Sequence, residues 1–179
     1  MKKEKIIRFI FLLTVVIIGQ SCKKSILDTD FDLPYQTSFT VPSTIGINLP
    51  VSLPSPDIST NSTQEFNNKG TRADLVKTVK LTKATLLITS PSGKKFSFLK
   101  SLHLFLSAPV VNELEVAYID NIPNTVGSSI TLIMNDKDLA PFIKAEKISL
   151  RSQVVTDETL LQDVTIQVNV TFHVVAQLL

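Results

Sequence analysis

The two histidines, His103 and His173, are the first side chains to consider for chemistry, because imidazole can transfer protons and bind metals. Both occupy polar positions in segments where polar and apolar residues alternate. Two imidazoles that meet on one sheet could bind zinc, but a structural zinc site needs about four ligands. The single cysteine, Cys22, belongs to an N-terminal leader-like segment. We therefore interpret both histidines as surface residues and predict neither a metal site nor a cofactor.

Paired carboxylates do not point to an enzyme either. Glu113 and Glu115 share one face of a predicted strand. A glycosidase needs two carboxyl groups about 5–10 Å apart in a cleft, one of them with a raised pKa. The chain also lacks the Gly-x-Ser-x-Gly elbow that exposes a nucleophilic serine. We predict no catalytic residue, and a glycan or peptide hydrolase would require a histidine that meets a buried carboxylate in a concave site.

An acidic stretch copies part of a calcium loop. Asp28, Asp30 and Asp32 have the spacing of the first three ligands of an EF-hand. However, Leu33 stands where that loop needs glycine, and Phe39 stands where it needs a bidentate glutamate. A solvated acidic tether is the better interpretation of this stretch.

The first 22 residues have the order of a secretory signal peptide. A basic start is followed by an apolar run over residues 9–18 and then by Gly19-Gln20-Ser21-Cys22. The run is too short to cross a membrane comfortably, because a spanning helix needs roughly 20 apolar residues. A cysteine at the expected cleavage point resembles the lipobox of bacterial lipoproteins.

This resemblance implies that residues 1–21 are removed and that Cys22 becomes an acylated, palmitate-bearing N-terminus. The protein would then be anchored in the bacterial cell envelope, with the outer membrane favoured over the inner, facing the periplasm or the cell surface. Gly19 stands where the family prefers leucine, and Gln20 stands where it prefers a small residue. Because Gly19 and Ser21 also suit an ordinary signal peptidase, simple secretion is an alternative, and an uncleaved membrane anchor is another.

The charge of the remaining chain is close to zero. Residues 1–21 carry four of the 18 Lys+Arg and one of the 16 Asp+Glu, which leaves 14 basic against 15 acidic residues, a net charge of −1. A near-neutral domain has no electrostatic footprint for nucleic acid. We therefore expect no nucleic-acid partner. The resemblance to lipoproteins implies the membrane as a partner, through the acyl chains on Cys22, and we also expect an envelope protein or glycan.

Apolar residues recur with a period of two along the rest of the chain, which is typical of β-strands. We predict a tether over residues 22–34 and a single domain over residues 35–179. Residues 78–89 form a strand whose apolar positions switch parity, which indicates a bulge near Thr82 and Lys83. Residues 55–71 are expected to form a long polar loop, and one short helix is expected near residues 138–146.

The last strand has the clearest pattern. Every even position from Val164 to Leu178 is apolar, so a strand would bury all of these side chains on one face. Several short strands, turn signals and one short helix predict an all-β fold, an antiparallel β-sandwich that is Ig-like in size and layering. A jelly roll and a partly open barrel fit the same pattern.

The odd positions of the last strand form a possible binding face of neutral hydrogen-bonding groups: Thr165, Gln167, Asn169, Thr171 and His173. Such a face could receive a glycan, a peptide or another subunit. It could equally be the hydrated face of a central strand, whereas an edge strand would permit strand addition by a partner. We expect a lipid-anchored envelope protein with a non-enzymatic binding, adhesion or structural role. The alternative is a carrier or sensor of an apolar small molecule.

Overall fold

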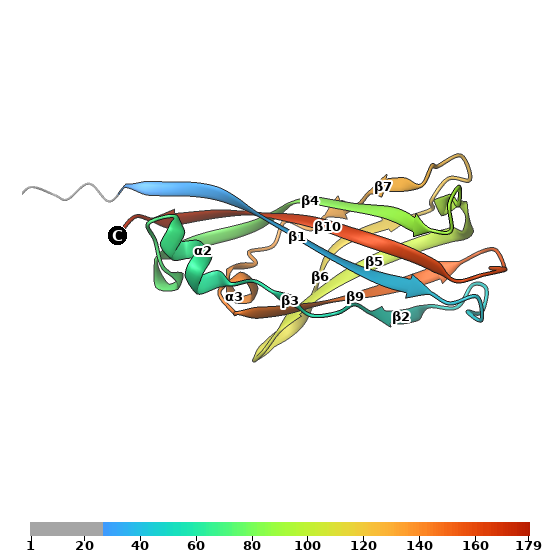
Figure 1. The fold of residues 1–179 in the computed structure, drawn as a ribbon, viewed down its shortest axis with the longest axis horizontal. Helices are drawn as coiled ribbons and strands as arrows, with labels where there is room; N and C mark the ends of the chain where they lie inside the picture. Colours follow the sequence, from blue (N-terminus) through green and yellow to red (C-terminus); the bar gives the residue numbers. More distant parts are fainter. Residues whose placement is uncertain (1–26) are drawn as a thin grey trace, which may run out of the picture.

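The computed structural model describes residues 27–179, which form two antiparallel β-sheets packed face to face (Figure 1). Cys22 and the predicted signal peptide lie outside the described residues. The expected antiparallel β-sandwich is confirmed. Within residues 27–179, no helix has the length and apolar character needed to cross a membrane.

The first sheet, which we call sheet A, has four strands in the order β1-β10-β4-β7. These strands span Asp28–Val41 (β1), Val164–Gln177 (β10), Val76–Ser90 (β4) and Ser129–Thr131 (β7). β1 and β10 have 14 residues each, so each strand extends roughly 45 Å at about 3.3 Å per residue. β1 begins beside the end of β10, where Asp28 pairs with Gln177. Sheet A therefore runs the length of an elongated molecule (Figure 1).

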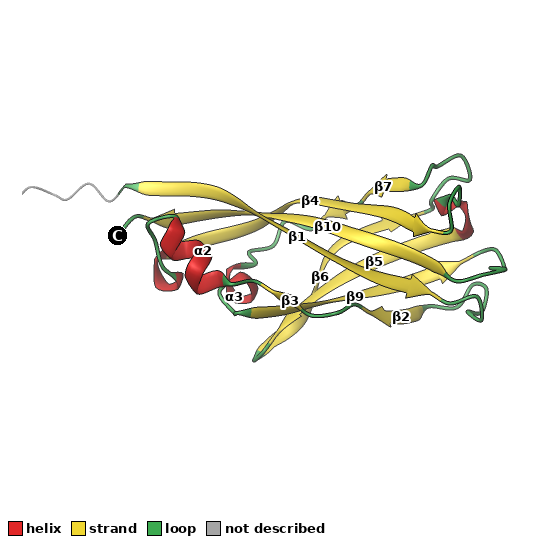
Figure 2. Cartoon of the chain, in the orientation of Figure 1, coloured by secondary structure: helices red, strands yellow, loops and turns green. Residues whose placement is uncertain are grey.

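The second sheet, sheet B, has the order β2-β9-β5-β6-β8, and β3 also pairs with β9. Its strands span Val51–Pro54 (β2), Ile58–Ser59 (β3), Leu99–Ala108 (β5), Val111–Asp120 (β6), Ile133–Met134 (β8) and Lys147–Thr156 (β9). The α-helices are α2 (Ser62–Asn68) and α3 (Ala140–Ile143), and short 3-10 turns cover Ala73–Leu75 and Phe96–Phe98. Figure 2 shows α2 and α3 at the end of the sandwich where the C-terminus lies.

The core lies between the sheets and confirms the period-two reading of the last strand. Even residues of β10 from Val164 to Ala176 are buried, and the odd residues are only partly covered. Leu178 is an exception, because β10 ends at Gln177 and Leu178 is 36% exposed. Burial stabilises each large apolar side chain by about 1.5–3 kcal/mol, so β10 contributes strongly to the core.

The bulge predicted in residues 78–89 is present in β4. Lys83 pairs with Thr171, while Leu81 pairs with the next residue, Phe172. Thr82 is therefore an extra residue on β4, and the inward positions change from odd to even across it. The extra residue lets Leu81 and Ala84 both reach the core although they are three positions apart.

The predicted tether over residues 22–34 is corrected where the structure describes it. Residues 28–34 belong to strand β1, so the folded domain includes them and does not begin at Tyr35. Phe31 and Leu33 are buried and pair with Val174 and Phe172 of β10. The aspartates that alternate with them occupy the outward positions of the strand. The interpretation as a solvated tether did not recognise that buried and exposed residues alternate here.

The predicted loop over residues 55–71 is also corrected, because it contains β3 and α2. Phe66 of α2 is fully buried and packs against Phe31 with ring centroids 6.3 Å apart. The helix predicted near residues 138–146 is confirmed as α3, with Pro141 in its first turn. Asp138 Oδ1 accepts hydrogen bonds from the backbone N–H of Ala140 and of Val79, which joins α3 to β4.

Candidate functional site

The predicted binding face belongs to a central strand. β10 lies between β1 and β4 and forms ladders with both strands. Its backbone groups are therefore occupied on both sides, and strand addition to β10 is not available to a partner. What remains for a ligand is the outward side-chain surface of sheet A.

Neutral polar residues continue across this surface in register. Asn169 of β10 pairs with Gln36 of β1 on one side and with Thr85 of β4 on the other. Thr85 in turn pairs with Thr131 of β7. The next row joins Pro34, Thr171 and Lys83. Because neighbouring strands are about 4.8 Å apart, amides, hydroxyls and one ammonium group are gathered within reach of a single small ligand.

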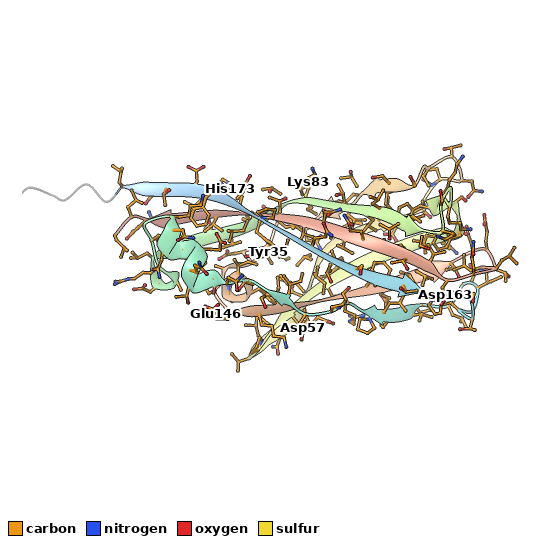
Figure 3. All side chains as sticks on the ribbon, in the orientation of Figure 1. Tyr35, Asp57, Lys83, Glu146, Asp163 and His173 are labelled. Carbon is orange, nitrogen blue, oxygen red and sulfur yellow. The ribbon has the colours of Figure 1, made fainter. Side chains whose placement is uncertain are left out.

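The two rows surround a shallow hollow with a volume of ≈ 520 Å³. We call it the sheet A hollow, and its lining comprises Pro34, Tyr35, Gln36, Lys83, Thr85, Asn169, Val170 and Thr171. Small-molecule sites have volumes of about 300–1,000 Å³, so the hollow falls within the size range of such sites. Figure 3 shows Lys83 and His173 along the sheet A side of the molecule, away from Glu146 and Asp57 on the opposite side.

Only part of the predicted face belongs to the hollow. Asn169 and Thr171 line it, whereas Thr165, Gln167 and His173 do not. Thr165 Oγ1 lies 3.4 Å from Thr40 Oγ1, and Gln167 Nε2 donates to Asn169 Oδ1 over 2.9 Å. His173 Nδ1 lies 2.8 Å from Asp32 Oδ1, on an exposed part of the sheet. Of these three side chains, only that of Gln167 contacts a residue that lines the hollow.

Lys83 differs from the other lysines of β4. Lys77 Nζ lies 2.7 Å from Asp28 Oδ1, and Lys80 Nζ lies 2.6 Å from Asp136 Oδ1. Among residues 27–179, no carboxylate lies within ion-pair distance of Lys83, which is exposed. The hollow therefore contains one uncompensated positive charge surrounded by neutral hydrogen-bonding groups.

Sequence reasoning missed Pro34, Gln36, Lys83 and Thr85. The parity switch at Thr82 and Lys83 was visible, but it indicated only a bulge. Assigning these residues to one site required the pairing of β10 with both β1 and β4, which residue spacing does not reveal.

Tyr35 fixes the floor of the hollow from the inner side of β1. Its hydroxyl donates to the Thr60 carbonyl oxygen over 3.1 Å, and its ring packs against Phe172 with centroids 5.9 Å apart. Burial, together with the nearby carboxylates of Glu65 and Glu146, raises the pKa of Tyr35 to about 12. The phenol therefore stays neutral at physiological pH and serves as a structural donor.

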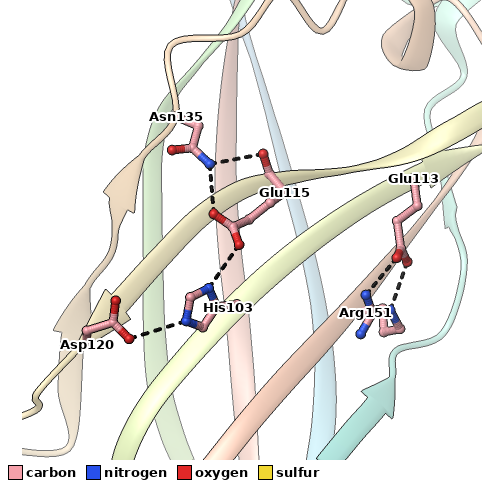
Figure 4. A network of polar contacts seen from close by, with 6 residues as sticks. All are labelled: His103, Glu113, Glu115, Asp120, Asn135 and Arg151. Atoms are coloured by element: carbon pink, nitrogen blue, oxygen red, sulfur yellow. Dashed lines mark hydrogen bonds and ion pairs between the residues drawn. The ribbon is translucent and has the colours of Figure 1, made fainter. Parts of the chain in front are cut away.

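The outer face of sheet B carries a polar network around His103 (Figure 4). His103 Nδ1 lies 2.9 Å from Glu115 Oε2, and Nε2 lies 3.3 Å from Asp120 Oδ1. Asn135 Nδ2 donates to Glu115 Oε1 over 3.1 Å. Burial tends to raise the pKa of Glu115, but the hydrogen bonds from His103 and Asn135 outweigh it and hold the pKa below its usual value.

A second pair on sheet B joins Arg151 to Glu113. Arg151 Nε and Nη2 donate to the two carboxylate oxygens over 2.8 and 2.6 Å, and the guanidinium lies 4.1 Å from the centre of the Phe105 ring. The hydrogen bonds from Arg151 lower the pKa of Glu113. The two glutamates considered for glycosidase chemistry are thus each bound to a different neighbour on an outer face. Across residues 27–179, no three His, Cys, Asp or Glu side chains are placed to hold a metal ion.

A second hollow of ≈ 330 Å³ lies beside the β9–β10 loop and includes Lys94, Glu158 and Leu161. Leu161 is 97% exposed, and all the lining residues except Lys94 come from one short segment, residues 158–164. The sheet A hollow is built from three strands instead, so its side chains are held more rigidly. We therefore regard the sheet A hollow as the better candidate site.

Comparison with known proteins identifies no family. No protein-family model matches the chain, and no curated protein matches it. Three solved structures illustrate the structural likeness. The capsid structure of Helicobacter pylori bacteriophage KHP30 is 11% identical and has a TM-score of 0.36, and the match covers 81% of this chain and 93% of that one. CpGH89CBM32-5 from Clostridium perfringens, solved in complex with GalNAc-beta-1,3-galactose, is 13% identical with a TM-score of 0.36, and the match covers 78% and 94%.

The decameric BFDV capsid protein is 10% identical with a TM-score of 0.38, and the match covers 84% of this chain and 99% of that one. At these identities the likeness concerns the β-sandwich fold alone. The functions of the three proteins carry no argument for this chain.

Proposed function

We propose that this protein is a lipid-anchored component of the bacterial cell envelope that binds another envelope component through the outer face of sheet A. The observation that carries the binding role is the sheet A hollow, where an unpaired Lys83 lies among the amides and hydroxyls of Gln36, Thr85, Asn169 and Thr171. A surface of this chemistry can hold a polar ligand by several hydrogen bonds at once.

The anchor rests on the sequence of the first 22 residues. Acylation of Cys22 by two or more chains gives stable attachment, because each buried CH₂ contributes about 0.8 kcal/mol. Five residues separate Cys22 from Asp28, and this link can extend over at most about 20 Å. Since β1 begins at one end of the elongated sandwich (Figure 1), an anchor there leaves the length of sheet A available to partners.

We propose that this role is non-enzymatic, and the arrangement of the polar side chains supports the proposal. His103 meets the carboxylates of Glu115 and Asp120, but a hydrolase would need a buried carboxylate, and these two side chains are 35% and 49% exposed on the outer face of sheet B. Neither the sheet A hollow nor the hollow beside the β9–β10 loop includes His103, Glu115 or Asp120. The polar lining of the sheet A hollow also gives no support to the alternative, a carrier of apolar molecules.

Fractionation and envelope binding together test this proposal. We expect full-length protein to sediment with membranes in the native host, and the C22S variant to appear in the soluble fraction. Detergent-solubilised protein should bind isolated envelopes, and N169A/T171A should bind them at least tenfold more weakly. The double variant T159A/Q162A alters polar side chains of the other hollow and serves as the matched control. Soluble wild-type protein, or equal binding by all variants, would contradict the proposal.

A further inference from the structure

The charge balance of the sheet A hollow indicates what kind of ligand it can hold. Each of the other two β4 lysines on this face is already neutralised, Lys77 by Asp28 and Lys80 by Asp136. Lys83 alone among the three brings an unpaired ammonium to the hollow. A ligand with one negative charge would complete this ion pair without displacing an existing one.

The remaining lining groups select for hydroxyls. The side-chain amides of Gln36 and Asn169 and the hydroxyls of Thr85 and Thr171 all donate and accept hydrogen bonds. Sugar hydroxyls also donate and accept, so they can match this set in several orientations. An apolar ligand would leave the same groups without partners, which is unfavourable once water is displaced.

We propose that the sheet A hollow binds a sugar acid, such as a uronic acid unit of an acidic glycan. Lys83 holds the carboxylate, and Gln36, Thr85, Asn169 and Thr171 bind the ring hydroxyls. This inference rests on the proposed function, because it names the ligand class of the same binding face. The bulge at Thr82 is part of the site, since it brings Lys83 outward opposite Thr171.

The spacing of the side chains agrees with a single ring. Asn169 and Thr171 are two residues apart on β10, and Lys83 and Thr85 are two residues apart on β4. Their Cα atoms thus form a grid of roughly 5 by 7 Å, set by the strand separation and the rise per residue. A pyranose ring with one carboxylate can contact all four corners of such a grid from above.

An acidic peptide fits the site less well. Peptides that bind to sheets usually pair with a free strand edge, whereas the hollow lies on the face of sheet A and is centred on β10, which has partners on both sides. A phosphate group commonly attracts several cations or backbone N–H groups, and the hollow offers Lys83 only. The lone cation and the neutral groups together favour the sugar acid.

Calorimetric titration of the detergent-solubilised full-length protein tests this assignment. The ligands are oligogalacturonate, its fully methyl-esterified form, polyglutamate and inorganic phosphate. We expect wild-type protein to bind oligogalacturonate at least tenfold more tightly than the ester. The K83M variant should lose that preference, and K80M, which changes a lysine outside the hollow, should retain it. Thermal unfolding of both variants would show that they are folded.

Several outcomes would overturn the assignment. These are equal binding of acid and ester, unchanged binding by folded K83M, equal or tighter binding of polyglutamate or phosphate, and no binding of oligogalacturonate. If oligogalacturonate does not bind while isolated envelopes still bind in a manner that depends on Asn169 and Thr171, the ligand class is wrong and the proposed function stands. If envelope binding is also independent of these residues, the proposed function fails as well.

Discussion

Lys83 of β4 lies directly opposite Thr171 of β10. From Leu81 to Lys83 the chain of β4 advances by two residues, whereas the paired residues of β10, Phe172 and Thr171, are adjacent. The extra residue Thr82 makes this arrangement possible, and its hydroxyl donates to the Thr171 carbonyl oxygen over 3.2 Å. The bulge therefore couples the backbone of sheet A to the position of the one unpaired cation in the hollow.

Deletion of Thr82 should preserve the fold and leave Lys83 at the hollow. Without Thr82, the sequence from Val79 to Ala84 alternates regularly, so Leu81 and Ala84 remain inward without any register shift. We expect a stability loss of about 1 kcal/mol for the missing hydrogen bond, measured by urea unfolding. Oligogalacturonate binding should change by less than about threefold, because Lys83 still lies outward between Leu81 and Ala84, opposite Thr171.

Deletion of Thr85 is the matched control for this experiment. It lies in the same strand but outside the bulge, so its removal would turn Leu86 and Ile88 away from the core. We expect this variant not to fold. Equal stability of the two deletion variants would contradict the role assigned to the bulge.

Substitution L33A tests where the folded domain begins. Leu33 is 4% exposed and packs in β1 opposite Phe172. Removal of such a buried side chain costs about 2–5 kcal/mol, which chemical denaturation can measure. The neighbouring outward substitution D30A should change the stability by less than about 0.5 kcal/mol. If L33A were as stable as D30A, residues 28–34 would behave as a tether after all.

Glu146 acts as a cap for α2 from a distant part of the chain. Its Oε1 accepts hydrogen bonds from the Thr63 backbone N–H and from the Ser62 hydroxyl, both over 3.1 Å, whereas the N-cap residue Asn61 makes no side-chain cap. The side-chain and backbone hydrogen bonds of Thr63, followed by those of Ser62, hold the pKa of Glu146 below its usual value. This lowered pKa gives a pH dependence with a definite sign.

A carboxyl group whose pKa falls on folding stabilises the protein above its unfolded pKa, and this contribution is lost as the pH falls through the folded pKa. We therefore expect the protection factors of the α2 amides, which are corrected for the intrinsic pH dependence of exchange, to fall on acidification in the wild type. In E146Q, these protection factors should already be lower at pH 7 and should change little with acid. Exchange in β10 serves as the internal control. An identical pH profile for wild type and E146Q would exclude the cap.

The Arg151–Glu113 pair on sheet B should contribute modestly to stability. The two side chains are 29% and 39% exposed, and exposed ion pairs are worth about 0.2–1 kcal/mol. A double-mutant cycle with R151M and E113Q should give a coupling in that range, decreasing at high salt. A coupling above about 3 kcal/mol would show that this network has a role beyond packing on Phe105.

The sequence alone predicted the features that depend on local alternation. The buried even positions of β10 and the parity switch in β4 are visible as patterns of single strands, and both are present. Residues 28–34 were misread because three aspartates suggested solvation, although Phe31 and Leu33 between them face the core.

Features that depend on distant partners could not be predicted. Helix α2 has a weak start signal of its own, and its cap comes from Glu146, 83 positions after Thr63. The candidate site also depends on residues that are distant in the sequence. Gln36, Lys83 and Asn169 come together only through the order of strands in sheet A. Residue types indicated that the face of β10 is polar, but the unpaired charge beside it required the structure.

We propose that the protein is held in the envelope through Cys22, and the mass of its mature N-terminal peptide tests this proposal most directly. The peptide would be taken from protein purified from membranes of the native host. We predict that the mature chain begins at Cys22 and that this residue carries the added mass of acyl chains. An unmodified cysteine at the N-terminus, or a peptide that still contains residues 1–21, would contradict the lipid anchor.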